Sequence, residues 1–173
     1  MYKRQITFGV IPSSPETGYG YIKSEKPLNK NALEGIKISE FIEKPNLKKA
    51  KELIKDSSYT WNSGIFMFRA KTIIDEIKKL CPDIFNACEE SFIKSKKDLD
   101  FLRLEKKSFL KCDNVSIDIS VFEKTKKAFV IPLSCGWDDV GSWESIWKIS
   151  KKDKKGNFVK GKTFINNLSL IHI

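Results

Sequence analysis

Three glycine-containing motifs carry a polar or acidic side chain next to a glycine, each at the edge of a predicted strand. They are residues 16–21 (ETGYGY), 61–64 (WNSG) and 136–143 (GWDDVGSW). A glycine lets the backbone approach a ligand closely, and its polar neighbour can then make the specific contact. Because ligands of open α/β sheets bind beyond the carboxyl ends of the strands, we expect the three motifs to converge on one crevice. Ordinary turns use the same residue types, so a purely structural role is the alternative for each motif taken alone.

The adjacent acidic residues Asp138 and Asp139 are the strongest candidates for a cation site. Mg²⁺ prefers oxygen ligands and usually takes only one or two carboxylates from a protein. The alternative is a helix cap, since the pair lies in a turn that opens a predicted helix near Ser142.

Glu43 and Lys44 place a hydrogen-bond acceptor next to a cation, directly before Pro45 at the end of a predicted strand. A glutamate could accept hydrogen bonds from sugar hydroxyls, and a lysine could neutralise a phosphate as a point charge. An exposed surface ion pair is the alternative interpretation of these two residues.

Several common kinds of site are excluded or disfavoured. His172 is the only histidine, which argues against most mechanisms in which a histidine activates a nucleophile. The sequence contains neither a GxGxxG motif nor a P-loop. The cysteines form no CxxC pair and make a poor zinc set, so we expect four reduced, structural thiols: Cys81, Cys88, Cys112 and Cys135.

Size and composition favour a globular domain. The chain has 173 residues, of which 40% are hydrophobic and 12% aromatic, and no stretch approaches the roughly 20 apolar residues of a membrane span. The N-terminal residues do not resemble a secretory signal, so we expect a cytoplasmic protein with no membrane partner. The net charge of +10 raises the alternative of nucleic-acid binding, but only three basic residues are arginine, and most lysines fit solvated faces.

The order of predicted strands and helices indicates a mixed α/β domain over residues 1–152, and a shift in composition after about Lys152 marks a candidate boundary. Residues 156–161 resemble the start of the β-rich C-terminal region of a bacterial nucleotidyltransferase family, so residues 153–173 are expected to begin such a region, incomplete here. Strands are predicted at 6–11, 35–42, 65–68, 128–133 and 163–165, the third and fourth of them buried. Helices are predicted at 47–55 after an Asn46 cap, at a segment with Ile73, Ile74, Ile77 and Leu80 on one face, and from 83 to about 110. Two more helices are predicted, at 116–124 and after a Ser142 cap. In the last helix, Trp143 and Trp147 are predicted core residues. Because the first predicted strand starts within a few residues of Met1 and the chain stops within the apolar residues 168–173, we expect a truncated domain.

Five sequence blocks together resemble bacterial mannose-1-phosphate guanylyltransferases in order and approximate spacing. The blocks are residues 7–22, 41–45, 61–68, 116–125 and 137–143, and the resemblance covers about 6–150. It implies a Rossmann-like nucleotidyltransferase fold, a mixed sheet flanked by helices, with its N-terminal half missing. The family joins mannose 1-phosphate to GTP with Mg²⁺, giving GDP-mannose and pyrophosphate.

The resemblance also assigns residues. Gly20 matches the glycine whose backbone approaches the sugar, Glu43 the acceptor for sugar hydroxyls, and Lys44 the lysine that faces the sugar phosphate. Asn62 matches a second sugar contact, and Asp139 the aspartate that binds Mg²⁺. Lys44 and Asp139 are therefore the predicted catalytic residues, while Asp118 lies in a family block without a firm role.

The family's glycine-rich nucleotide loop and its other magnesium aspartate lie upstream of the blocks present here. We therefore expect these 173 residues to be inactive or nearly so alone, whereas a full-length protein could form a homo-oligomer. Three alternatives stay open: a glucose-1-phosphate thymidylyl- or uridylyltransferase, a basic RNA-binding module, and a non-catalytic remnant.

Overall fold

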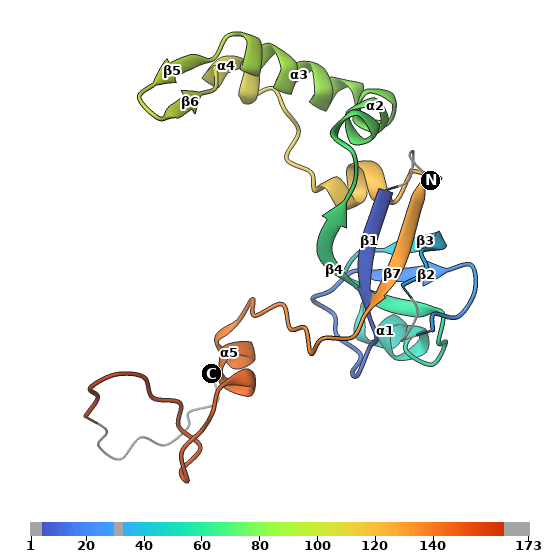
Figure 1. Cartoon of the computed structure of the whole chain (residues 1–173), viewed down its shortest axis with the longest axis vertical. Coiled ribbons are helices and arrows are strands. Elements are labelled where there is room, and N and C mark those ends of the chain that lie inside the picture. Colours follow the sequence, from blue (N-terminus) through green and yellow to red (C-terminus); the bar gives the residue numbers. More distant parts are fainter. Residues whose placement is uncertain (1–4, 30–32, 165–173) are drawn as a thin grey trace. The chain divides into compact units, whose positions relative to one another are not determined.

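The computed structural model describes residues 5–29 and 33–164 and divides into two compact units, Met1–Trp137 and Asp138–Ile173. The centre of the first unit is a closed five-stranded barrel in the strand order β1-β4-β2-β3-β7 (Figure 1). Its strands are β1 (Gln5–Val10), β2 (Tyr21–Ser24), β3 (Ile36–Ile42), β4 (Tyr59–Met67) and β7 (Ala128–Leu133). β1 and β7 are parallel and the other neighbours antiparallel, so the predicted mixed sheet is confirmed.

Strand β2 was not predicted, because its four residues directly follow the glycine-rich turn and are too few to show an alternating pattern. The segment predicted at 65–68 is the end of the longer strand β4. Its predicted burial is wrong, since the Ile65 and Met67 side chains are exposed in this structure.

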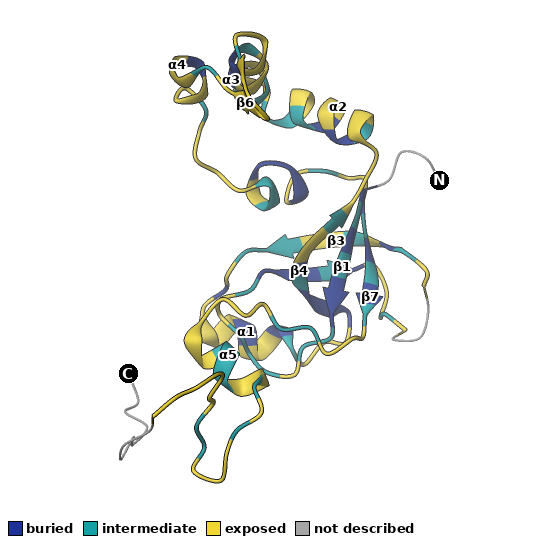
Figure 2. Cartoon of the chain, turned by 60° about the vertical axis from the view of Figure 1, so that its left-hand side comes forward, coloured by how far each residue is buried: buried dark blue, intermediate teal, exposed yellow. Residues whose placement is uncertain are grey.

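Two hydrophobic clusters hold the first unit together. One packs helix α1 (Leu47–Leu53) against the barrel through Ala50 and Leu53, which contact a cluster that includes Tyr21 and Trp61. The other joins helix α2 (Ala70–Leu80) to β7 and to a π-helical turn, η1 (Asp118–Phe122). Figure 2 shows the buried residues concentrated in the barrel strands.

The predicted cap of α1 is confirmed, because the Asn46 side chain accepts a hydrogen bond from the Lys49 amide at 2.9 Å. The helix predicted at 116–124 is instead the short η1 turn.

The expected helical stretch 83–110 is only partly helical. Helix α3 (Pro82–Ile93) is followed by a hairpin of β5 (Lys96–Asp98) and β6 (Phe101–Arg103), and then by the four-residue helix α4 (Lys106–Phe109). Leu99 has a φ of +51° between the two strands, a left-handed conformation that interrupts a helix.

In the second unit, helix α5 (Trp143–Ile149) begins after Ser142, whose hydroxyl accepts from the Ser145 amide as predicted. The predicted burial of Trp143 is wrong, since 86% of this residue is exposed. Trp147 is half-buried, and its indole N–H donates to the Gly156 carbonyl at 2.8 Å. Residues 163–164 are irregular, while the rest of that predicted strand and His172 lie outside the described residues.

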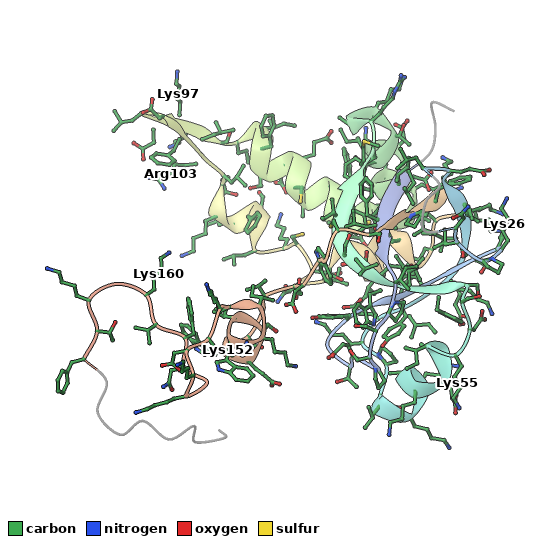
Figure 3. All side chains as sticks on the ribbon, turned by 60° about the horizontal axis from the view of Figure 1, so that its bottom comes forward. Lys26, Lys55, Lys97, Arg103, Lys152 and Lys160 are labelled. Carbon is green, nitrogen blue, oxygen red and sulfur yellow. The ribbon has the colours of Figure 1, made fainter. Side chains whose placement is uncertain are left out.

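The basic side chains of the first unit are distributed over separate elements. Figure 3 labels Lys26 after β2, Lys55 after α1, and Lys97 and Arg103 on the two hairpin strands, all of them exposed. None of the described helices is long and apolar enough to cross a membrane.

The first prediction concerns Gly9 in β1, where a Cβ atom would lie 2.3 Å from Thr60 Oγ1 and 2.6 Å from Val130 Cγ2. Because both neighbours are fully buried, Gly9→Ala should lower the free energy of unfolding by about 1–3 kcal/mol in urea titrations. Gly18→Ala is the matched control, since no atom lies within 4 Å of its added Cβ. Equal stability of the two variants would contradict the packing described for β1.

A second prediction concerns Glu105, whose carboxylate caps α4 by accepting from the Lys107 and Ser108 amides and the Ser108 hydroxyl. These hydrogen bonds lower the Glu105 pKa to about 2. A lowered pKa in the folded state stabilises the fold above about pH 4.5, the ordinary value, and the effect is lost as the pH falls toward 2.

We therefore expect Glu105→Gln to reduce the hydrogen-exchange protection of the Ser108 amide near pH 6, with the difference from wild type shrinking toward pH 2. Glu52→Gln, at an exposed position of α1, is the control. A difference that does not depend on pH would contradict this role of the Glu105 charge.

Candidate functional site

The pairing of β2 with both its neighbours brings three predicted site residues together. Tyr21 pairs with Ile42 of β3 and with Trp61 of β4, and both pairings are antiparallel. Antiparallel strands run in opposite directions, so the residue that precedes Tyr21 lies opposite the residues that follow Ile42 and Trp61. Gly20 therefore lies between Glu43 and Asn62, which are far from it in the sequence.

The contacts agree with this register. The Asn62 amide donates to the Gly20 carbonyl at 2.7 Å. A Cβ atom on Gly20 would lie 2.7 Å from Glu43 Oε2 and 3.4 Å from Asn62 Cβ. A side chain at position 20 would therefore displace the Glu43 carboxylate, whereas the predicted approach of a ligand to the Gly20 backbone stays a prediction.

Asn62 is fixed by three hydrogen bonds to its side chain. Its Oδ1 accepts from Thr7 Oγ1 at 3.0 Å and from the Gly64 amide at 3.2 Å. Its Nδ2 donates to Asp118 Oδ1 at 2.9 Å. The network orients the Asn62 amide and links β1, β4 and η1 at one point.

Of the other members of this network, Thr7 was not predicted as a site residue and Asp118 was given only a weak site role. Thr7 lies in the first family-like block and is fully buried on β1, but nothing in the sequence distinguishes it from a strand residue that packs in the core. Asp118 also lies in a family-like block, and its link to Asn62 depends on the fold of η1.

Glu43 is a partly buried carboxyl group beside other acidic groups. Its side chain is 23% exposed, and that burial is the main cause of a raised pKa. Asp118 raises the Glu43 pKa further, Lys44 opposes this, and Glu123 adds a smaller rise. A positive charge or a hydrogen-bond donor bound near Glu43 would therefore relieve an unfavourable local charge.

Lys44 is held beside Glu43 but faces solvent. Its φ of +45° is a left-handed conformation that non-glycine residues rarely adopt, and it lies between β3 and the buried Pro45. Lys44 Nζ is 3.7 Å from Glu43 Oε1, and its side chain remains 64% exposed. The ammonium group is therefore loosely paired and can turn toward an anion.

An aromatic cluster borders Gly20 on the side of the glycine-rich turn. The Tyr19 ring makes edge contacts with Trp61 at 5.2 Å and with Trp137 at 5.5 Å between ring centroids. Tyr19 and Trp137 are partly buried against the core cluster that contains Trp61. These rings fix the turn that presents Gly20.

The acidic pair of Asp138 and Asp139 belongs to the second unit. Asp138 Oδ1 accepts from the Val140 amide at 2.8 Å, in a turn where Val140 has a φ of +50°. Asp139 is exposed, and the cap of α5 is Ser142 rather than either aspartate. One exposed carboxylate is a donor of the kind that Mg²⁺ prefers. Among the described residues, no group of three or more His, Cys, Asp or Glu side chains could hold a metal ion.

Comparison with known proteins identifies the relatives of this chain. It is 46% identical over 165 residues to a mannose-1-phosphate guanylyltransferase of Salmonella montevideo, covering 94% of this chain and 35% of that relative. The corresponding enzyme of Escherichia coli strain K12 is 43% identical over 157 residues, covering 90% and 33%. An alginate biosynthesis protein of Pseudomonas syringae is 46% identical over 165 residues, covering 94% and 33%. The chain thus spans about a third of the length of the curated relatives it matches.

Two solved structures share the fold. A mannose-6-phosphate isomerase from Helicobacter pylori is 34% identical with a TM-score of 0.69, covering 79% of this chain and 52% of its own. A Thermus thermophilus protein described as mannose-1-phosphate geranyltransferase is 27% identical with a TM-score of 0.70, covering 87% and 41%. The predicted nucleotidyltransferase-like α/β fold is therefore confirmed.

The model of one protein family, nucleotidyl transferase, matches residues 2–156, which include the barrel and every predicted site residue. The match covers most of the chain and agrees with the relatives and the fold, so the chain belongs to the nucleotidyl transferase family.

Proposed function

We propose that this chain supplies the sugar-phosphate half of a mannose-1-phosphate guanylyltransferase, which makes GDP-mannose and pyrophosphate from mannose 1-phosphate and GTP. The observation that carries the proposal is the position of Gly20 between Glu43 and Asn62, set by the two pairings of β2. The two mannose-1-phosphate guanylyltransferases named above support mannose over the glucose-1-phosphate transferases considered from the sequence.

Each residue of this group has a chemical part in the proposal. Glu43, as a carboxylate, accepts hydrogen bonds from sugar hydroxyls, and binding such donors favours its ionised form. Gly20 leaves room for the sugar ring against the backbone, while the oriented amide of Asn62 limits where the ring can lie. Asp118 is a positioning residue, since it acts on the sugar through Asn62.

Lys44 is the proposed partner of the sugar phosphate. Its ammonium group lies next to Glu43 and is mostly exposed, so it can pair with a phosphate while Glu43 holds the sugar. In the reaction, a phosphate oxygen of mannose 1-phosphate attacks the α-phosphorus of GTP and pyrophosphate leaves. The protein's main task is to hold two anions in line.

We infer that Asp139 is one ligand of Mg²⁺ in a complete site. Its exposed carboxylate fits the oxygen preference of this ion, and the Asp138–Val140 hydrogen bond fixes the turn that carries it. When bound, Mg²⁺ would neutralise negative charge on the phosphates. We further propose a cytoplasmic protein that has no nucleic-acid partner and that could assemble as a homo-oligomer at full length.

Calorimetry on the 173-residue chain tests the proposal. Mannose 1-phosphate should bind, mannose should bind about 10-fold or more weakly because the Lys44–phosphate pair is absent, and no GDP-mannose should form with GTP and Mg²⁺. Lys44→Gln should remove the preference for the phosphate, and Lys48→Gln, on an exposed face of α1, should keep it. Tight, salt-sensitive RNA binding without sugar-phosphate binding would refute the proposal, and turnover like that of a complete enzyme would refute the half-site.

A further prediction concerns Gly20→Ala. The added Cβ would push against Glu43 Oε2, the end of a flexible side chain, so the fold should survive while the carboxylate moves. We expect mannose 1-phosphate to bind about 10-fold or more weakly, with little change in the thermal midpoint, and Gly18→Ala to bind like wild type. Equal affinity of the two alanine variants would argue against a sugar site at Gly20.

A further inference from the structure

Two cysteines from different elements lie side by side, away from the candidate sugar-phosphate site. Cys88 lies in α3, and Cys112 follows α4. Their sulfur atoms are 4.0 Å apart, although 24 positions separate them in the sequence. Cys88 is exposed and Cys112 is half-buried, so the pair is accessible from solvent through Cys88. This accessibility corrects the expectation that all four cysteines are structural, as does the exposure of Cys135.

The neighbourhood of the two thiols is fixed by other contacts between the same segments. The Ser91 hydroxyl donates to the Glu105 carbonyl at 2.9 Å, and the Glu105 amide donates to the Ser91 carbonyl at 3.1 Å. Ser91 lies one helical turn after Cys88 on α3. Glu90 also pairs with Lys111, next to Cys112, at 3.2 Å. These contacts hold α3 against residues 105–112, so the sulfur atoms stay close.

We propose that Cys88 and Cys112 are a reversible redox modification site, at which a small-molecule disulfide converts the two thiols into an intramolecular disulfide. A disulfide bond is about 2.05 Å long, so the sulfur atoms must approach by about 2 Å, a distance within reach of side-chain rotation. The two thiolates react in sequence with a disulfide such as oxidised glutathione.

The exchange balances in two steps. The Cys88 thiolate, having lost its proton to solvent, attacks one sulfur of oxidised glutathione, which forms a mixed disulfide and releases one glutathione thiolate. The Cys112 thiolate then attacks the Cys88 sulfur, which forms the protein disulfide and releases the second glutathione. Two protein thiols are oxidised and one glutathione disulfide is reduced to two thiols.

Exposure and electrostatics set the order of these steps. Cys88 meets the oxidant first because it is exposed. The pKa of Cys112 is raised by burial first, and then by Cys88, Asp113 and Cys81. Cys112 therefore holds its proton more firmly and reacts second, with the sulfur that lies next to it.

The disulfide would close a loop that contains the β5–β6 hairpin and α4. This segment has exposed strands and a helix of four residues, and it has little core of its own. A cross-link from α3 to residue 112 restricts its local opening, because it removes conformations of the opened loop. Oxidation should therefore protect residues 94–112 from proteolysis and leave the positions of Glu43 and Asn62 unchanged.

The test treats the folded chain with oxidised glutathione, blocks the remaining thiols and maps the disulfides by mass spectrometry. Cys81 and Cys88 share one tryptic peptide, so a second cleavage before Asp83 is needed to separate them. We expect the reactive thiols to fall from four to two, a Cys88–Cys112 cross-link, slower cleavage within 94–112, and full reversal by a dithiol reductant.

Serine variants of the four cysteines show which two of them form the disulfide. Cys81→Ser and Cys135→Ser should keep the cross-link, Cys88→Ser should lose it, and Cys112→Ser should accumulate one glutathione on Cys88. A cross-link to Cys81, a stable mixed disulfide on Cys88 in the wild-type chain, or no loss of thiols from the folded chain would overturn the proposal.

Discussion

The candidate site depends on the position of β2 as the middle strand of an antiparallel trio. β3 and β4 both run antiparallel to β2, and Tyr21, the first residue of β2, pairs with Ile42 of β3 and with Trp61 of β4. The next residue of each neighbour, Glu43 or Asn62, therefore lies opposite Gly20. A single glycine is thereby held between a glutamate and an asparagine from distant parts of the sequence. A one-residue slip of either pairing would turn Glu43 or Asn62 to the other face of the sheet.

The surrounding contacts keep this register and give it a polar character. Helix α1 and the Tyr19 ring pack against the core cluster that contains Tyr21 of β2. Hydrogen bonds of the Asn62 side chain to Thr7 and Asp118 connect β4 to β1 and η1. Glu43 lies partly buried near Asp118, which raises its pKa, and Lys44 provides a nearby cation. A ligand with hydroxyl donors on one side and a phosphate on the other matches this distribution of charge, which is why we favour a sugar phosphate.

The sequence predicted the local parts of this arrangement better than the long-range ones. Asn46 and Ser142 were correctly predicted as caps because a cap is a local hydrogen bond between neighbours in the chain. Strand β2 and the β5–β6 hairpin were missed because four or three residues carry too little pattern to distinguish a strand. Trp143 was predicted to be buried from its residue type alone, whereas burial depends on what packs against the helix.

The same distinction applies to the site. Gly20, Glu43, Lys44 and Asn62 were identified from motifs, and the structure brings them together. Thr7 and the contact of Asp118 with Asn62 could not be predicted, since each depends on which strand or turn lies beside β4. Asp139, in the second unit, stays a prediction, as does the domain boundary after residue 152.

The central claim is that Gly20, Glu43 and Asn62 form one binding point for a sugar phosphate. The most direct measurement is a titration of the ¹⁵N-labelled chain with mannose 1-phosphate, followed by the backbone amide signals of Gly20 and Glu43 and the side-chain amide of Asn62. We predict that these three signals move together with one dissociation constant while the Gly18 amide moves little. Signals that stay fixed at saturating ligand, or movement confined to the lysine-rich residues 151–155, would contradict the account.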